Sequence, residues 1–343
     1  MVTLKEVAKR AGVSIATVSN VLHGSVPVSE ERRKRVLKVI HELDYHPNLI
    51  ARSLKSKHSR MIGLVIPDIC NPFFPQLARG AEDAAWECGY SLVIFNTDDQ
   101  VDRELQALNT LRSRRIDGVL LVTCAGGGAS EGAKKMADAE IPIVALDRKL
   151  AGFDCDSVLV DNRAGARECV RSMIQAGHKR IAIICGPSSI HNARERLQGY
   201  KDALRAADLK EDPALIRYGD YRHESGYRCA LELLKRERAP DAIFASNGTM
   251  GQGLLEAIAE VGALLPGKFA IGSFDDVRYT ASVKLPIFSV SQPVYQIGYA
   301  GSKLLIRRLE GEAKDEKPIH LKLPTVFKGP KLQSSSKMPA KAT

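Results

Sequence analysis

The stretch "TLKEVAKRAGVSIATVSNVLHG", residues 3–24, has the pattern of two short helices joined by a tight turn. Thr3 and Glu6 have the spacing of a capping box, and apolar residues at helical spacing follow as far as Gly12. A glycine at this point ends a helix readily, and Ser14 can cap the next one. This order of helix, turn and helix predicts a helix-turn-helix unit, whose second helix enters the major groove of DNA.

The residues that follow complete a three-helix headpiece. Ser29 can begin a third helix, in which Val36, Val39, Ile40 and Leu43 recur at helical spacing. On the second helix, small hydroxyl, amide and apolar side chains face outward, and such side chains can contact phosphates and base edges. They are Ile15, Ala16, Thr17, Ser19 and Asn20.

Positive charge is concentrated at the two ends of the chain. Residues 1–60 carry 12 Lys and Arg against 5 Asp and Glu, and residues 311–343 carry 7 Lys against 3 acidic residues. The whole chain has a net charge of +10, so the middle is close to neutral. A basic N-terminal module on a neutral body favours a polyanion as the partner of that module.

Other classes of protein fit this sequence poorly. No apolar run reaches the ~18 residues of a membrane span, and the N-terminus lacks the apolar core of a secretory signal. The seven cysteines are widely spaced with no C-x-x-C pair, which predicts reduced thiols in the cytoplasm. Motifs for nucleotide-dependent, zinc-dependent or serine-dependent catalysis are absent from the sequence, so we expect no enzyme, no cofactor and no metal.

The body, residues 60–328, alternates short apolar runs with amphipathic stretches. Runs such as "MIGLVIPD" and "GVLLVT" predict buried parallel strands, and the pattern occurs twice. We therefore expect an α/β fold of two doubly wound lobes. In such sheets, ligands bind beyond the carboxyl ends of the strands, so the residues directly after each run are the candidates.

Those positions carry aromatic rings, carboxylates, amides and guanidinium groups. Rings can stack on the apolar faces of a sugar, and the polar groups can bind its hydroxyls. Asp147 and Asp275 are also readable as a carboxylate pair for acid–base chemistry, but no motif supplies a nucleophile. The candidates are Asn71, Phe73, Phe74, Asp147, Arg148, Arg196, Tyr221, Asn247, Asp275 and Gln292.

Residues 3–55, which include "VSEERRKRVLKVIHELDYHPNLIARSLK" after the opening stretch, closely resemble the headpiece of the LacI/GalR family of bacterial transcription regulators. The resemblance implies a repressor that binds double-stranded operator DNA. Ile15, Ala16 and Asn20 match positions where the family reads bases. The positions that match its phosphate contacts are Thr3, Ser14, Thr17, Ser19, His23, Tyr45 and Asn48.

The segment "NLIARSLKSKHSR", residues 48–60, resembles the hinge of that family. The resemblance implies that this segment becomes helical on operator DNA and that two hinges of a dimer lie in the minor groove. Leu54 then matches the leucine that enters between base pairs, and Lys55 matches a neighbouring minor-groove contact. An apolar wedge of this kind costs unstacking energy, which a bend in the DNA offsets through additional contacts.

The body resembles the effector domain of the same family and periplasmic ribose-binding protein. Motifs such as "NPFF", "LDR" and "ARER" match ribose contacts, which implies a small sugar, a pentose such as ribose, between two lobes. Arg148 favours a sugar over a purine. Gly248 departs from the family, which commonly has Asp there, and leaves a purine, a nucleoside, a sugar phosphate or a protein cofactor open as alternatives.

The expected organisation has four parts. Residues 1–46 form the headpiece, 47–59 the hinge, 60–328 the two-lobed effector-binding and dimerisation domain, and 329–343 a disordered basic tail. The chain should cross between lobes near residues 161, 291 and 322. The tail has no leucine heptads of the kind that form tetramers in this family, so a homodimer is expected.

Overall fold

A computed structural model describes residues 2–23, 26–45, 58–124, 129–262, 269–277, 285–312 and 316–330. Within it the chain divides into two compact units, residues 1–59 and 60–343. Most of the predicted hinge therefore lies outside the described residues, including Asn48, Leu54 and Lys55. The predicted tail also lies outside them from residue 331 onward.

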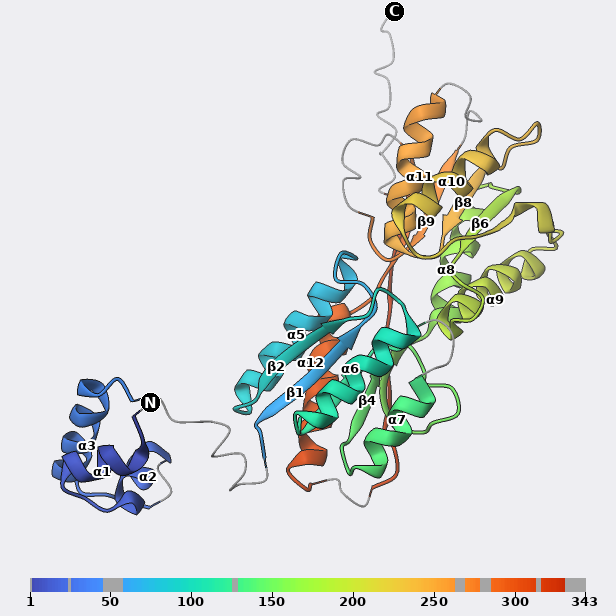
Figure 1. Ribbon diagram of the computed structural model, residues 1–343. Helices are drawn as coiled ribbons and strands as arrows, with labels where there is room; N and C mark the ends of the chain where they lie inside the picture. Colours follow the sequence, from blue (N-terminus) through green and yellow to red (C-terminus); the bar gives the residue numbers. More distant parts are fainter. Residues whose placement is uncertain are drawn as a thin grey trace, which may run out of the picture. The chain divides into compact units, whose positions relative to one another are not determined.

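The first unit is a three-helix headpiece (Figure 1). Its helices are α1 (Leu4–Ala11), α2 (Ile15–His23) and α3 (Glu30–Glu42). The predicted capping box is confirmed, because Thr3 N–H donates to Glu6 Oε2 at 2.7 Å and Glu6 N–H donates to Thr3 Oγ1 at 3.3 Å. Val7, Val18 and Val36, one from each helix, are fully buried at the centre of the unit.

Gly12 ends α1 in a left-handed conformation, with a φ of 66°. A Cβ atom at this position would meet no neighbour within 4 Å, so only backbone strain opposes a side chain there. We expect Gly12→Ala to lower the free energy of unfolding of the headpiece by about 1–2 kcal/mol. Gly12→Asn should cost less, because asparagine tolerates this conformation.

Hydrogen exchange of the α1 and α2 amides in the full chain measures both variants. Equal protection in the Ala and Asn variants would show that the left-handed turn is not the reason for the glycine.

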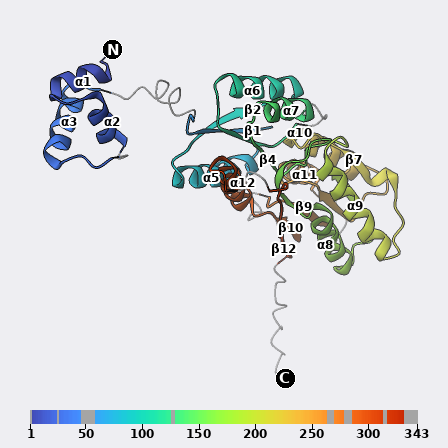
Figure 2. The same cartoon turned by 90° about the horizontal axis from the view of Figure 1, so that it is seen from below.

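The second unit contains two α/β lobes (Figures 1 and 2). Lobe 1 has a six-stranded parallel sheet in the order β11-β5-β4-β3-β1-β2. Its strands are β1 (Met61–Ile66), β2 (Ser91–Asn96), β3 (Gly118–Leu121), β4 (Ile143–Leu146), β5 (Asp156–Val160) and β11 (His320–Leu323). Helices α5 (Phe73–Glu87) and α12 (Val294–Leu309) cover one face, and α6 (Val101–Ser113) and α7 (Ala129–Asp138) the other.

Lobe 2 repeats this plan, with the strand order β12-β10-β9-β8-β6-β7. Its strands are β6 (Ile181–Cys185), β7 (Ile216–Tyr218), β8 (Ala242–Ala245), β9 (Ala270–Phe274), β10 (Ile287–Ser291) and β12 (Val326–Lys328). Helices α8 (Asn162–Gln175) and α9 (His191–Ala206) lie on one face, α10 (His223–Leu234) and α11 (Gly248–Val261) on the other, and the short helix η1 (Pro213–Leu215) precedes β7. The edge strand β12 is antiparallel to β10, so this sheet is parallel except at one edge.

The chain passes between the lobes after β5, after β10 and after β11. Each lobe is therefore assembled from segments that are far apart in the sequence. Ionic and polar contacts secure the crossing segments: Lys322 Nζ is 2.7 Å from Asp161 Oδ2, and Lys328 Nζ is 2.7 Å from Asp276 Oδ2.

Glycines allow the helices of each lobe to pack backbone against backbone. In lobe 1, a Cβ at Gly298 would lie 1.9 Å from the Leu77 carbonyl oxygen, and a Cβ at Gly80 would lie 2.0 Å from that of Tyr295. Gly253 has the same role between α10 and α11, where a Cβ would lie 2.2 Å from the His223 carbonyl oxygen. Among the described residues, no helix has the length and hydropathy needed to cross a membrane.

Candidate functional site

The ten predicted effector residues lie around one cavity between the lobes, together with Asn192. We call this space the effector cavity. Lobe 1 contributes the start of α5 and the loop after β4, and lobe 2 contributes α9 and the loops after β7, β8 and β9. Gln292 stands where the chain leaves β10 for α12. The set comes together because parallel strands place their carboxyl ends at the same edge of a sheet.

Three of these residues have a backbone conformation that side chains disfavour. Asp147, Tyr221 and Asp275 have φ values of 58°, 69° and 72°. Each follows a strand closely, and the left-handed turn directs its side chain into the effector cavity. Strain of this kind costs of order 1–3 kcal/mol per residue and is concentrated at functional sites in proteins.

Two buried arginines bring positive charge to the cavity. Arg148 Nη1 donates to Asp99 Oδ1 and to the Thr123 carbonyl oxygen, both at 2.8 Å. Arg196 donates through Nε to Asn162 Oδ1 at 2.8 Å and through Nη1 to the Ser246 carbonyl oxygen at 2.7 Å. Both guanidinium groups are therefore held firmly in place before any ligand arrives.

The Arg196 guanidinium also stacks on an aromatic ring. Its central carbon lies 3.7 Å from the centre of the Phe274 ring, within the range of a cation–π contact. At the start of α5, Phe73 and Phe74 pack edge to face with their ring centres 5.1 Å apart. The effector cavity thus combines fixed polar groups with aromatic surface.

Several polar atoms of the cavity are buried without a hydrogen-bond partner. They are Asp147 Oδ1, Arg148 Nε and Gln292 Oε1. Leaving a polar group buried and unpaired costs about 1–3 kcal/mol, so proteins rarely keep such groups without a reason. A ligand rich in hydroxyl groups can donate to the two oxygens and accept from the nitrogen.

Burial raises the pKa of the Asp147 carboxyl, while Arg196 and Arg148 act in the opposite direction. Burial also raises the pKa of Asp275, against the effect of Arg196 and a hydrogen bond from Gln292 Nε2 at 2.6 Å. Both carboxyls are therefore more easily protonated than an exposed aspartate. A ligand that donates hydrogen bonds to them favours their ionised forms.

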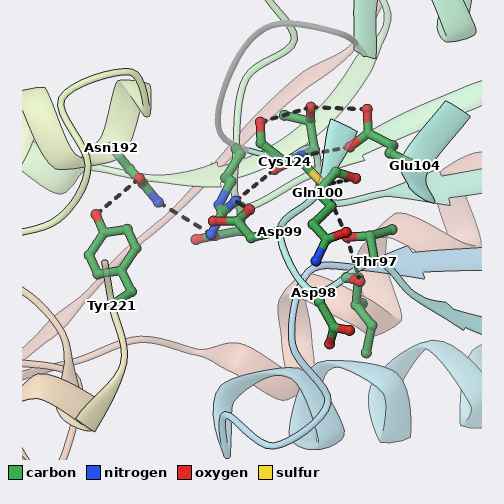
Figure 3. A network of polar contacts seen from close by, with 12 residues as sticks. Thr97, Asp98, Asp99, Gln100, Glu104, Cys124, Asn192 and Tyr221 are labelled. Carbon is green, nitrogen blue, oxygen red and sulfur yellow. Dashed lines mark hydrogen bonds and ion pairs between the residues drawn. The ribbon is translucent and has the colours of Figure 1, made fainter. Parts of the chain in front are cut away.

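The two lobes touch each other directly at the cavity. Asn192 of lobe 2 donates through Nδ2 to Asp147 Oδ2 of lobe 1 at 3.3 Å. The Oδ1 of Asn192 accepts from the Tyr221 hydroxyl at 3.4 Å (Figure 3). The cavity has a volume of about 30 Å³, which is room for one or two water molecules. A larger ligand would need the walls of the cavity to move apart.

Sequence reasoning missed Asn192 and the residues that support Arg148. Asn192 lies four positions before Arg196, on the same face of α9. Asp99 follows the apolar run of β2, so the rule that selected the other residues would have found it too.

In the headpiece, α2 presents the predicted base-reading residues at its surface. Ile15 and Ala16 are exposed, with Ile15 at 48%, and Asn20 is half-buried. Ser14 Oγ accepts from Thr17 N–H at 3.1 Å, as expected for the residue before a helix. Tyr45, a predicted phosphate contact, packs its ring in the headpiece core.

The remaining predicted phosphate contacts differ in exposure. Thr3 is exposed, and Ser19 is half-buried on α2. The side chain of His23 lies outside the described residues.

Comparison with known proteins places both units in one family. The description "Bacterial regulatory proteins, lacI family" matches residues 3–48, and "Periplasmic binding proteins and sugar binding domain of LacI family" matches residues 59–330. The chain belongs to the LacI family. It is a DNA-binding transcriptional regulator and not an enzyme. The expected family, the two-lobed fold and the absence of enzymatic function are thereby confirmed.

Relatives within the family match the chain along most of its length. Catabolite control protein A of Priestia megaterium is 34% identical over 322 residues, which cover 93% of this chain and 96% of that protein. The ribose operon repressor of Halalkalibacterium halodurans is 36% identical over 315 residues, 92% of each chain. The structure of the lac repressor dimer bound to operator and the anti-inducer ONPF has a TM-score of 0.82 at 26% identity, covering 96% of this chain and 98% of that one.

Proposed function

We propose that this LacI-family member is a cytoplasmic repressor that binds operator DNA as a homodimer and senses a small sugar, a pentose such as ribose. The observation that carries the proposal is the set of unpartnered buried atoms on Asp147, Arg148 and Gln292, which face the same cavity as two phenylalanines. Groups of this kind suit the hydroxyls and the apolar faces of a sugar ring. The similar ribose operon repressor supports a ribose-class ligand.

Binding affects DNA through the relative position of the lobes. A ligand shifts this equilibrium only by its difference in affinity for the two arrangements. The hydrogen bond between Asn192 and Asp147 would differ between the two arrangements, because it spans the lobes and lies in the cavity. In the proposal, the hinge segment 47–59 transmits the change, with Leu54 and Lys55 as its contacts in the minor groove.

A thermal-shift panel tests the ligand class. The full chain is heated with pentoses, hexoses, their phosphates and purines. A ligand at 100 times its dissociation constant adds about 2.7 kcal/mol, which raises Tm by roughly 5–10 °C for a domain of this size. A rise in Tm with a pentose supports the proposal. A rise in Tm with purines alone would show that the effector is a purine and not a sugar. No shift in the whole panel would favour a protein cofactor.

The raised pKa values predict a pH dependence of sugar binding. Hydroxyl donors stabilise the ionised forms of Asp147 and Asp275, so binding releases protons wherever these carboxyls are protonated in the free protein. Affinity should be constant at high pH and should fall as the pH is lowered through the raised pKa values. Calorimetry from about pH 7.5 to about pH 5 measures this fall.

Asp275→Asn is the matched control for the pH series, because it removes one of the two ionising groups. Its affinity should be lower overall and less dependent on pH. If the affinity of the unchanged protein for the sugar rises as the pH is lowered, these carboxyls do not accept hydrogen bonds from its hydroxyls.

For the headpiece, we expect Asn20→Ala to relax base preference. Loss of a side chain that reads a base edge costs about 1–3 kcal/mol at its own position in the site. Ser19→Ala, a predicted phosphate contact on the same helix, should weaken binding to all sequences alike. Selection of binding sites from random DNA, followed by affinity measurements on single-base changes, compares the two variants. If the base preference of the Asn20 variant is unchanged, Asn20 does not read a base.

A further inference from the structure

A carboxylate is buried in lobe 1 outside the effector cavity. Glu104, in the first turn of α6, is fully buried and does not line the cavity. Burial raises the pKa of its carboxyl, whereas hydrogen bonds from Cys124 and Thr123 and the charge of Arg148 lower it. A buried carboxylate is costly unless hydrogen bonds and a counter-charge compensate it, so its partners indicate what it does.

One peptide group joins Glu104 to Arg148. The Cys124 N–H donates to Glu104 Oε2 at 2.6 Å (Figure 3), and Arg148 Nη1 donates to the Thr123 carbonyl oxygen at 2.8 Å. This N–H and this carbonyl are the two ends of the same peptide group, which is planar, so they point in opposite directions. The carboxylate and the guanidinium therefore hold one rigid group from its two sides, through charge-assisted hydrogen bonds.

The side chains next to this peptide make weaker contacts. Thr123 Oγ1 donates to Glu104 Oε1 at 3.5 Å, and Cys124 Sγ lies 3.0 Å from Thr97 Oγ1 and donates to the Gln100 carbonyl oxygen at 3.5 Å. Burial raises the pKa of the Cys124 thiol to about 12, so the thiol stays neutral. A neutral thiol is a weak hydrogen-bonding group, and the orientation of the peptide depends mainly on Glu104.

At the other end of the peptide, Arg148 lines the effector cavity. Its Nη1 has two hydrogens, and they are used by Asp99 Oδ1 and by the Thr123 carbonyl oxygen, both at 2.8 Å. These two acceptors fix the plane of the guanidinium group and hence the direction of Nε–H, which is buried without a partner. If the carbonyl turned away, Asp99 alone would hold Nη1 and the plane could rotate.

We propose that Glu104 is a positioning residue for effector binding, which acts through the peptide between Thr123 and Cys124 to hold the Arg148 guanidinium in its orientation at the cavity. The inference rests on the proposed function, because this orientation affects a ligand only if the cavity binds one. A purely local role, in which Glu104 only accepts the N–H that follows β3, would leave Arg148 where it is.

Two substitutions separate the reach of the side chain from its charge. Glu104→Gln keeps the length and an acceptor oxygen for the Cys124 N–H but loses the charge. Glu104→Asp keeps the charge but is one methylene shorter, so its carboxylate draws back from that N–H. Calorimetry with ribose should show an affinity within about threefold of the unchanged chain for the Gln variant, and a loss of at least about tenfold for the Asp variant. The opposite order would overturn the proposal, because charge and not position would then matter.

Nuclear magnetic resonance of the full chain without ligand observes Arg148 directly. The Nε–H signal of Arg148 is assigned by its loss in Arg148→Lys. Glu104→Asp should shift or broaden this signal, and Glu104→Gln should leave it in place. An unmoved signal in the Asp variant would overturn the proposal.

Leu111→Ala is the matched control for stability. Leu111 is buried two turns further along α6, so its truncation destabilises lobe 1 without touching the peptide at Cys124. The Arg148 signal and the affinity for ribose should both stay unchanged. A shift of the signal as large as that in the Asp variant would overturn the proposal, because any loss of stability in lobe 1 would then move Arg148.

The two readouts also distinguish this inference from the proposed function. Ribose could fail to bind the unchanged chain while the Arg148 signal moves in the Asp variant alone. That result would reject ribose as the effector and support the positioning of Arg148 by Glu104. Conversely, ribose binding of equal strength in the unchanged chain and the Asp variant would overturn the role of Glu104 and leave the proposed function intact.

Discussion

We expect Arg196→Met to abolish the proposed sugar binding and to lower the free energy of unfolding of the two-lobed unit by about 3–5 kcal/mol. Arg196 is 3% exposed, and its guanidinium opposes the effect of burial at both Asp147 and Asp275. Without it, two buried carboxyls lose their shared counter-charge. Asn162 Oδ1 and the Ser246 carbonyl oxygen also lose their donor. Denaturant unfolding and calorimetry measure the two effects separately.

Arg163→Met is the matched control, because this arginine on α8 is half-exposed and pairs with Asp202 at the surface. It should cost less than about 1 kcal/mol and leave sugar binding unchanged. Arg196→Lys keeps the positive charge but loses the planar guanidinium group with its several N–H donors. This variant should therefore regain more of the free energy of unfolding than of the affinity for the sugar. The free energy of unfolding of the methionine variant could instead lie within about 1 kcal/mol of that of the unchanged protein. That result would show that water already solvates the two carboxyls and that the cavity is more open than its geometry indicates.

We expect Gly298→Ala to destabilise lobe 1, although alanine is the better helix former. Helix propensity alone would favour alanine by about 1 kcal/mol. The added methyl group, however, would lie 1.9 Å from the Leu77 carbonyl oxygen and 2.9 Å from the Ala81 backbone nitrogen. These are backbone atoms of α5, so the two helices must move apart. Forcing atoms into a packed interface costs typically 1–3 kcal/mol, occasionally more, and we expect a net loss at the upper end of this range.

Gly329→Ala is the control, since its methyl group would meet the Phe327 ring at an ordinary 3.5 Å. Its melting temperature should match that of the unchanged protein. Thermal unfolding should place the Gly298 variant several degrees lower, at about 2–4 °C for each kcal/mol. A Gly298 variant as stable as the Gly329 variant would mean that α5 and α12 adjust without cost.

Strong periodic patterns predicted most of the fold. The capping box at Thr3 and the buried apolar runs, such as β1 and β6, correspond to helices and strands of the structure. The strands β7, β11 and β12 had no such signal. They are three or four residues long, lie at sheet edges and bury little, so their sequences are not continuously apolar. Their pairing depends on the sheets that they join.

The site was predictable to the extent that it follows from topology. Residues after parallel strands share one edge, and this rule brought Asp147, Asn247 and Asp275 together. It could not predict that Asn192 reaches Asp147 from the other lobe, or that Asp99 pairs with Arg148. Those contacts depend on how closely the lobes pack and on loop geometry, which no local sequence pattern specifies.

The threefold passage of the chain between the lobes has a consequence for synthesis on the ribosome. The apolar face of α5, with Phe74, Leu77 and Ala81, is covered by α12, which begins only at Val294. At about 5–20 residues per second, roughly ten to forty seconds pass between the emergence of the two helices. All of lobe 2 except β12 is translated in this interval. Nearly all of lobe 2 is thus synthesised before lobe 1 receives α12 and β11, and exposed apolar surface on α5 is what a chaperone would encounter in the meantime.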